Sequence, residues 1–412
     1  MPMNRRQFLS NSARRAGAGA LAIGAVAASE ANPDFSKVRQ DFPWIENQTY
    51  LNCGTYHPLN VYAARAIERY TEYKVKGPGP DRPHVSPGAM QEVKSLYGKL
   101  INAKPTELAF VQSTLAGENI IVGGLGLHRS GGNIVTDEFH YHGGVHIYRE
   151  LAKTAGLELR IVRQKGWRTR VADFEKLVDR NTRLIAITLV SNINGYLQDS
   201  KALSELAHAH GAYLYADVVQ AAGCIPMDVR KMGLDFCSAG TYKWLMGLTG
   251  LGFLYVREEL LDHVKPSQFG EQYTNFKYHN FPGSPPGDEE VSYDLKPGAA
   301  IYEIGAVPFI AIACQQASLK YIHKLRVSNI RRHVKPLTER LWTEVPKLGY
   351  PTITPPGTPT PLVAFQVKEP ELLTAKLQKA NVNVKVKWNQ MRVTPSVFNN
   401  QDDIDRLLEA IA

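Results

Sequence analysis

Two residues that could cooperate in covalent catalysis follow neighbouring short apolar runs in the middle of the chain. Asp217 and Gln220 follow the run 213–216, and Lys243 follows the run 236–239. A lysine amine can hold an aldehyde as a Schiff base, as in enzymes that use pyridoxal phosphate (PLP). A carboxylate can keep the pyridine nitrogen of that cofactor protonated, so that the ring accepts electrons from a substrate. We therefore predict PLP as the cofactor, with Lys243 and Asp217 as catalytic residues.

The phosphate of such a cofactor needs hydroxyls and backbone N–H groups, which the N-terminus of a helix supplies. Ser113 and Thr114 lie where an apolar run, 108–112, gives way to a helical pattern over 114–127. We predict that both residues bind the phosphate.

Short apolar runs alternate with helical patterns between residues 108 and 256, which is typical of a mainly parallel sheet with helices on both faces. In such sheets ligands bind at the carboxyl ends of the strands, where Asp217 lies. The predicted strands are 108–112, 133–136, 157–162, 184–190, 213–216, 236–239 and 252–256, and the predicted helices are 114–127, 144–155 and 201–210.

The pattern changes after this region. Residues 267–300 are rich in Pro, Gly, Tyr and Asn and are predicted to form a long loop. A helical stretch follows from Ile304 to about Leu348, and we expect it to break near Pro336. The last predicted elements are strands at 361–367 and 382–388 and a helix at 402–411. The predicted organisation is a leader at 1–31, an N-terminal segment at 32–65 that packs with the small domain, a large PLP-binding α/β domain at 66–295 and a small α+β domain at 296–412.

The composition is that of a globular protein, with 44% hydrophobic and 21% charged residues, which excludes a disordered chain. The formal net charge of +9 includes four arginines of the leader. No dense Lys/Arg stripe with aromatic residues is present, so we expect no nucleic-acid partner. The four cysteines are scattered without metal-binding spacing, and we expect buried free thiols.

The first 31 residues have the features of an export signal. A basic start precedes an uncharged run of 13 residues, 16–28, which is too short to cross a hydrocarbon core of about 30 Å and so predicts no stable membrane anchor. Arg5 and Arg6, followed by Gln-Phe-Leu, resemble the twin-arginine type. We expect the folded protein to be exported by the twin-arginine translocase to the periplasm or beyond.

Taken in order, five motifs resemble those of the class V aminotransferases, a group of fold type I PLP enzymes. This group includes cysteine desulfurases, kynureninase and isopenicillin N epimerase-like proteins. The motifs are the loop 50–58, the turn 111–114, the strand end 190–195, the pair Asp217 and Gln220 with Lys243, and the segment 391–395. The resemblance implies the PLP-dependent transferase fold type I and a homodimer.

The resemblance also implies further site residues. Asn192 and Gln220 would approach the phenolic oxygen of the cofactor, and Tyr242 would join Thr114 at the phosphate. Arg392 would grip a substrate carboxylate in a bidentate fork, with Asn52 and Thr55 on the substrate side.

A ring-stacking residue is expected near His140, with Tyr141 and His142 as alternates. The spacing of His140, His142 and His146 is also compatible with a metal site. We favour stacking by His140 over metal binding.

We therefore predict an exported PLP enzyme that acts on an amino acid or amine by transamination, with epimerisation, Cα–Cβ or β-lyase chemistry, or tailoring of a periplasmic peptide or siderophore as alternatives. The segment 382–392 contains no cysteine, from which we expect that the chain is not a persulfide-type cysteine desulfurase. A non-catalytic binding protein and a metal hydrolase that uses the three histidines are less favoured. The intact Lys243, Asp217 and Arg392 argue against the first, and the second leaves the lysine and aspartate unexplained.

Overall fold

The computed structural model describes residues 33–80, 82, 84–129, 131–270, 274–276 and 293–412. The expected export leader and much of the expected loop 267–300 lie outside the described residues. Residues 34–412 form one compact unit, and the domain boundaries predicted within them stay a prediction. Among the described residues, no helix has the length and apolar character needed to span a membrane.

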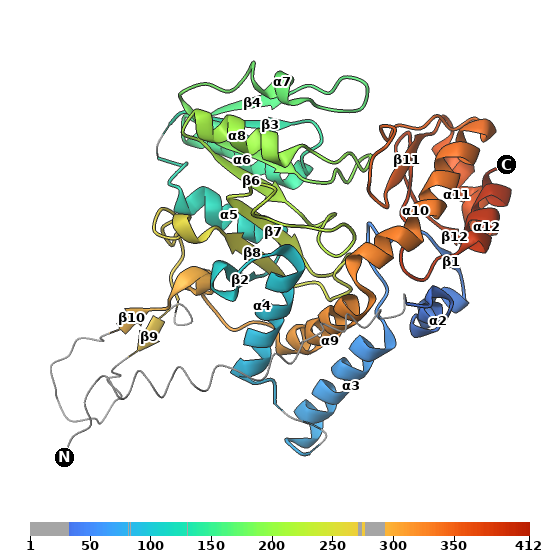
Figure 1. Cartoon of the computed structure of the whole chain (residues 1–412), viewed down its shortest axis with the longest axis horizontal. Helices are drawn as coiled ribbons and strands as arrows, with labels where there is room; N and C mark the ends of the chain where they lie inside the picture. Colours follow the sequence, from blue (N-terminus) through green and yellow to red (C-terminus); the bar gives the residue numbers. More distant parts are fainter. Residues whose placement is uncertain (1–32, 81, 83, 130, 271–273, 277–292) are drawn as a thin grey trace, which may run out of the picture. The chain divides into compact units, whose positions relative to one another are not determined.

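A seven-stranded sheet carries the larger part of the fold, in the order β2-β8-β7-β6-β5-β3-β4 (Figure 1). The five strands β7, β6, β5, β3 and β4 run parallel to one another, whereas β8 is antiparallel to β2 and β7. The predicted mainly parallel α/β fold is confirmed. Each predicted strand of this sheet begins and ends within two residues of the observed strand. The strands are β2 (Leu108–Val111), β3 (Asn133–Asp137), β4 (Glu158–Val162), β5 (Thr182–Thr188), β6 (Tyr213–Asp217), β7 (Phe236–Gly240) and β8 (Gly252–Val256).

Both faces of this sheet are covered, which explains why its strands are continuous apolar runs. Along β5, Ile185 and Ile187 belong to one core cluster, and Leu184 and Ala186 belong to another. Such alternation places the two sets on opposite faces of the sheet. The helices between strands are α5 (Thr114–Gly124), α6 (His142–Thr154), α7 (Val171–Phe174) and α8 (Ser200–Ala209).

The N-terminal and C-terminal parts are mostly helical, and α3 and α4 both pack against α9. The predicted break near Pro336 is wrong. The helices α9 and α10 separate at Arg326, whose φ of 64° takes the backbone out of the helical conformation, and Pro336 lies inside α10. The helices are α2 (Phe35–Val38), α3 (Val61–Lys76), α4 (Pro87–Ile101), α9 (Phe309–Leu325), α10 (Val327–Glu344), α11 (Pro370–Lys379) and α12 (Gln401–Ile411).

A three-stranded antiparallel sheet, β11-β14-β13, packs with α11 and α12. The predicted strand 382–388 is divided in two, because its first part pairs with β1 and its second part pairs with β14. The remaining strands are β1 (Thr49–Tyr50), β9 (Thr274–Phe276), β10 (Tyr293–Leu295), β11 (Val363–Gln366), β12 (Val382–Asn383), β13 (Lys385–Lys387) and β14 (Gln390–Val393).

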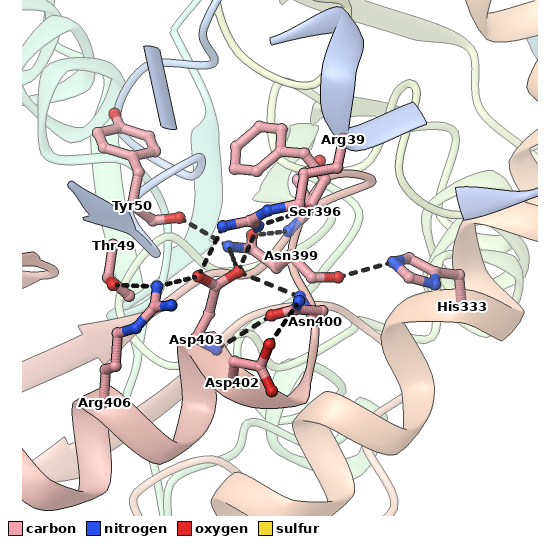
Figure 2. Close-up of polar contacts among 11 residues, drawn as sticks. Arg39, Thr49, Tyr50, His333, Ser396, Asn399, Asn400, Asp402, Asp403 and Arg406 are labelled. Atoms are coloured by element: carbon pink, nitrogen blue, oxygen red, sulfur yellow. Dashed lines mark hydrogen bonds and ion pairs between the residues drawn. The ribbon is translucent and has the colours of Figure 1, made fainter. Parts of the chain in front are cut away.

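A buried carboxylate joins the N-terminal segment to the last helix (Figure 2). Asp403 accepts hydrogen bonds from both terminal nitrogens of Arg39, at 2.8 and 3.2 Å, from Asn399 Nδ2 at 3.0 Å and from the backbone N–H of Asn400 at 3.1 Å. Asn399 Nδ2 also donates to the carbonyl of Tyr50, at the end of β1. This network fixes the segment that continues from β1 into the loop 52–58.

We predict that Asp403→Asn destabilises the protein by about 3 kcal/mol, because it leaves the Arg39 guanidinium without its buried counter-charge. Denaturant unfolding of the purified protein measures this change. The matched control is Asp402→Asn in the same first turn of α12, where the carboxylate is exposed and accepts, among the described residues, only from the Asn400 side chain. Equal losses in the two variants would mean that the effect comes from the helix dipole rather than from the buried pair.

Candidate active site

Six of the predicted site residues line a cavity of about 910 Å³, whereas the others, Asn52, Ser113, Thr114, Asp217 and Gln220, are not among the residues that line it. Its walls come from the loop 54–56, the start of α6, the loop after β5, the loop after β7 and the β13–β14 hairpin. Among the lining residues are Lys243, Tyr242, His140, Asn192, Thr55 and Arg392. Residues from segments more than 300 positions apart in the sequence therefore face one space.

Lys243 lies in the loop after β7, and its side chain is almost completely buried. Within the described residues it has no hydrogen bond or ion pair, and its ammonium lies 5.5 Å from the centre of the Tyr242 ring. Burial lowers the pKa of Lys243 to about 8, with opposition from Asp217 and support from the positive charges of Arg392 and Lys385. The amine is therefore far easier to deprotonate than an exposed lysine.

Asp217 ends β6, next to the strand that precedes Lys243. It is buried, and its Oδ1 accepts a hydrogen bond of 2.9 Å from the backbone N–H of Val219. Burial raises the pKa of Asp217 to about 6, while the Val219 N–H, Lys243 and His140 act in the opposite direction. A carboxylate in this state is suited to a cationic partner such as a protonated ring nitrogen.

The predicted phosphate residues lie beside the lysine loop. Ser113 caps α5 by accepting from the Ala116 N–H, and Thr114 Oγ1 accepts from the Gly240 N–H at 2.9 Å. A Cβ atom at Gly240 would come within 3.0 Å of the Tyr242 ring, so glycine lets these two segments approach. Burial raises the pKa of Tyr242 to about 12, which keeps its hydroxyl protonated as a hydrogen-bond donor.

These residues fit PLP. A buried lysine that forms no hydrogen bond or ion pair with the described residues, a buried carboxylate beside it, and hydroxyl groups at the N-terminus of α5 supply the three anchors that the cofactor needs. When bound, PLP supplies an electron sink for bonds broken at the substrate Cα.

Gln220 is held between two loops. Its Nε2 donates to the carbonyl of Gly54, and its Oε1 accepts from Trp244 Nε1, both at 2.8 Å. One N–H of the amide remains for the predicted contact with the phenolic oxygen, which stays a prediction. The contacts show that Gln220 links the N-terminal loop to the lysine loop.

His140 is buried in a polar network that the sequence did not reveal. Its Nε2 lies 2.9 Å from Glu118 Oε1 and its Nδ1 lies 3.1 Å from Thr188 Oγ1, while its ring stacks on Tyr148. Burial alone would lower the pKa of His140, but the Glu118 carboxylate, together with Asp217 and Asp137, outweighs this and raises it. Tyr148 also donates to Glu118.

The missed Glu118 left one usable signal. It is the only charged residue in the first eleven residues after Ser113, a stretch otherwise made of small and apolar side chains with one Asn. A lone charge in a buried helix indicates a specific partner.

The three histidines do not converge. His142 and His146 are exposed while His140 faces Glu118, and no group of three or more His, Cys, Asp or Glu side chains suited to a metal occurs in the described part of the chain. Tyr141 donates its backbone N–H to Thr188. Which of His140, Tyr141 and His142 stacks on the cofactor ring stays a prediction. The His140 ring is held by contacts at both of its nitrogens.

Arg392 is buried without a carboxylate partner among the described residues. Its terminal nitrogens donate to the carbonyl of Asn192 and to Thr55 Oγ1, both at 2.7 Å, and its Nε has no partner. Thr55 in turn donates to Asn52 Oδ1, so three predicted substrate-side residues are connected. Burial lowers the pKa of Arg392 to about 10. A buried guanidinium in this state is a ready site for an anion.

Comparisons with known proteins agree with this geometry. The chain is 27% identical over 312 residues to a probable cysteine desulfurase of Methanothermobacter thermautotrophicus, covering 75% of each chain. It is 25% identical over 378 residues to an uncharacterized aminotransferase, YcbU, of Bacillus subtilis, covering 91% of this chain and 96% of the other. The structure of a cysteine desulfurase from Thermococcus onnurineus superposes with a TM-score of 0.78 at 23% identity, over 90% of this chain and 96% of that one.

One prediction from the sequence is contradicted by these findings. We expected the chain not to be a persulfide-type cysteine desulfurase, yet relatives in sequence and in structure are cysteine desulfurases. The expectation rested on the missing cysteine in 382–392, and one segment is too narrow a basis because a reaction depends on the whole site.

The match to a family model decides the assignment. Residues 54–387, which hold nearly every residue of the cavity, match the model described as aminotransferase class-V. The fold is that of the fold type I PLP enzymes, with its mainly parallel sheet. The chain therefore belongs to the class V aminotransferase family of PLP-dependent enzymes.

Proposed function

We propose that this protein binds PLP covalently through Lys243 and removes the α-proton of an amino acid whose carboxylate binds Arg392. The observation that supports this most strongly is that two buried basic side chains, Lys243 and Arg392, line one cavity and form no ion pair within the described structure. The Lys243 amine, once deprotonated, can attack an aldehyde, and the Arg392 cation suits a carboxylate.

The chain's own groups have separate tasks in this proposal. Arg392 and Thr55 bind and orient the substrate carboxylate, which fixes the Cα atom beside Lys243. With PLP bound, the Lys243 amine would accept the α-proton of the substrate, because a pKa near 8 suits a general base at neutral pH. Asp217 holds a proton on the ring nitrogen, and Thr114 and Tyr242 hold the phosphate.

We predict that the rate of PLP loading into the cofactor-free protein rises with pH around a midpoint of about 8, because only the neutral Lys243 amine attacks the aldehyde. Growth of the yellow absorption band in stopped-flow measurements gives this rate. Borohydride reduction followed by peptide mass spectrometry should find the cofactor on Lys243, and Lys243→Ala should lack the band. Lys385→Gln, which removes a positive neighbour, should shift the midpoint upward. A midpoint near 10, or label on another lysine, would contradict the assignment.

The sulfur chemistry of the relatives gives the first reaction to test. We propose that the substrate loses a sulfur-bearing group from Cβ, as in desulfuration of cysteine to alanine with the sulfur passed to a thiol acceptor. Several relatives and solved structures named cysteine desulfurase support this branch, and the relative named an aminotransferase makes transamination the alternative to test against it.

With cysteine and excess dithiothreitol as sulfur acceptor and reductant, we expect alanine and sulfide in equal amounts. Arg392→Gln should lower kcat/KM by 10- to 100-fold or so, because charge-assisted hydrogen bonds to the carboxylate are lost. Arg183→Gln, an exposed arginine at the start of β5, is the matched control. Conversion of the bound cofactor to its amine form with release of a keto acid, and no sulfide, would assign transamination instead.

We also propose that the leader directs export of the folded protein through the twin-arginine translocase. The support is the pair Arg5 and Arg6 before the short apolar run 16–28. Replacing both arginines by lysine should retain the protein in the cytoplasm, as cell fractionation would measure. Unchanged periplasmic recovery would overturn the proposal.

The homodimer is part of the same proposal. Tyr56, 54% exposed, and Trp388, 76% exposed, lie among the residues that line the cavity. Large aromatic side chains of this kind are enriched at protein interfaces, which supports a second subunit near the mouth of the cavity.

A further inference from the structure

A second cation lies directly opposite Arg392 in the small sheet. Lys385 of β13 and Arg392 of β14 are paired across the antiparallel ladder, and both line the cavity. Residues paired in this way project from the same face with their Cβ atoms about 5 Å apart. Like charges at such positions repel one another and destabilise the sheet.

Nothing in the described part of the chain neutralises this pair. The strands β11, β13 and β14 contain no acidic residue, and Lys385 has no ion pair there. The acidic residues of the cavity are occupied elsewhere, because Asp137 accepts from Thr169 and Gln198, and Glu138 pairs with Arg163.

The surroundings of Lys385 differ from those of an ordinary surface lysine. Its side chain is half-buried, and its pKa is lowered to about 8 by burial first and then by Arg392 and Lys387. Part of this lowering of the Lys385 pKa comes from Arg392, which is the repulsion that the strand pairing implies. An anion bound between the two side chains would relieve their repulsion and raise the pKa of Lys385, which favours its charged form.

We propose that Lys385 binds a second negative group on the side chain of the substrate, while Arg392 binds its α-carboxylate. The substrate class is then an amino acid with an anionic side chain, which the sulfur chemistry proposed above places on a sulfur-bearing group at Cβ, as in cysteine sulfinate. This inference rests on the proposed function, because it assigns the substrate of the same site. The flat Arg392 fork suits a carboxylate, and the compact Lys385 ammonium suits an anion of any shape.

The test compares dianions and monoanions of matched length on the PLP-loaded protein. Calorimetry measures the binding of malonate, succinate and glutarate against propionate, butyrate and valerate, so that the unknown spacing of the two cations is scanned. We expect the best dianion to bind about tenfold more tightly than its monoanionic partner, because it adds one charge-assisted hydrogen bond.

Lys385→Gln should remove this preference and leave monoanion binding within about threefold of the parent, since Arg392 is intact. Its unfolding temperature should equal or exceed that of the parent, because the repulsion is gone. Lys379→Gln, an exposed lysine at the end of α11, should keep the preference.

Two results would overturn the inference. If Lys385→Gln weakens monoanions and dianions equally, the lysine shares the α-carboxylate with Arg392. If the parent shows no preference for dianions, the second anion site does not exist. Failure of the proposed function is distinguished in the same samples, because it appears as the absence of the yellow band rather than as altered selectivity.

Discussion

The site depends on one constraint: the ionisable side chains of Lys243, Asp217 and Arg392 are buried, and none of them forms an ion pair within the described residues. Lys243 and Asp217 lie in the same low-dielectric surroundings, and burial moves both toward neutrality, with the pKa of one falling to about 8 and that of the other rising to about 6. Their mutual attraction limits these shifts but does not abolish them. Buried ions of this kind cost several kcal/mol each, so the fold must supply the stability from elsewhere. In return, the amine and the carboxylate are reactive before any ligand arrives.

Fixed contacts between distant segments supply that stability. His57 donates its backbone N–H to the carbonyl of Tyr242, and its ring bonds Ser396 on one side and the Pro58 carbonyl on the other. Because a carbonyl can only accept, Nδ1 of His57 carries the proton and Nε2 accepts from the Ser396 hydroxyl. Gln220 makes a second link between the same loops. The lysine loop, the N-terminal loop and the segment after β14 are thus held as one unit, which is what a preorganised site requires.

The sequence predicted best those features that depend on local order. Asp217 and Lys243 were identifiable because each follows a short buried strand, and parallel strands bring their carboxyl ends to one edge. The break between α9 and α10 was misplaced, because proline was weighed above a backbone turn at Arg326 that no local pattern marks. Glu118 and Lys385 were missed for another reason. The partner of Glu118 is His140, 22 residues away in the turn before α6, and the partner of Lys385 lies across a hairpin, so local periodicity indicates neither contact.

Positive charge dominates the cavity, and this has a consequence for its ligands. Arg392 lowers the pKa of both Lys243 and Lys385, and Lys385 also lowers that of Lys243. Glu118 raises the pKa of His140 and so favours the positively charged form of this histidine, which lies near Asp217. A cofactor phosphate and substrate carboxylates bring negative charge into this space, and each relieves repulsion that the folded chain otherwise carries. Because ligands that bind only the folded state stabilise it, cofactor and substrate binding are linked to stability through the same electrostatic strain.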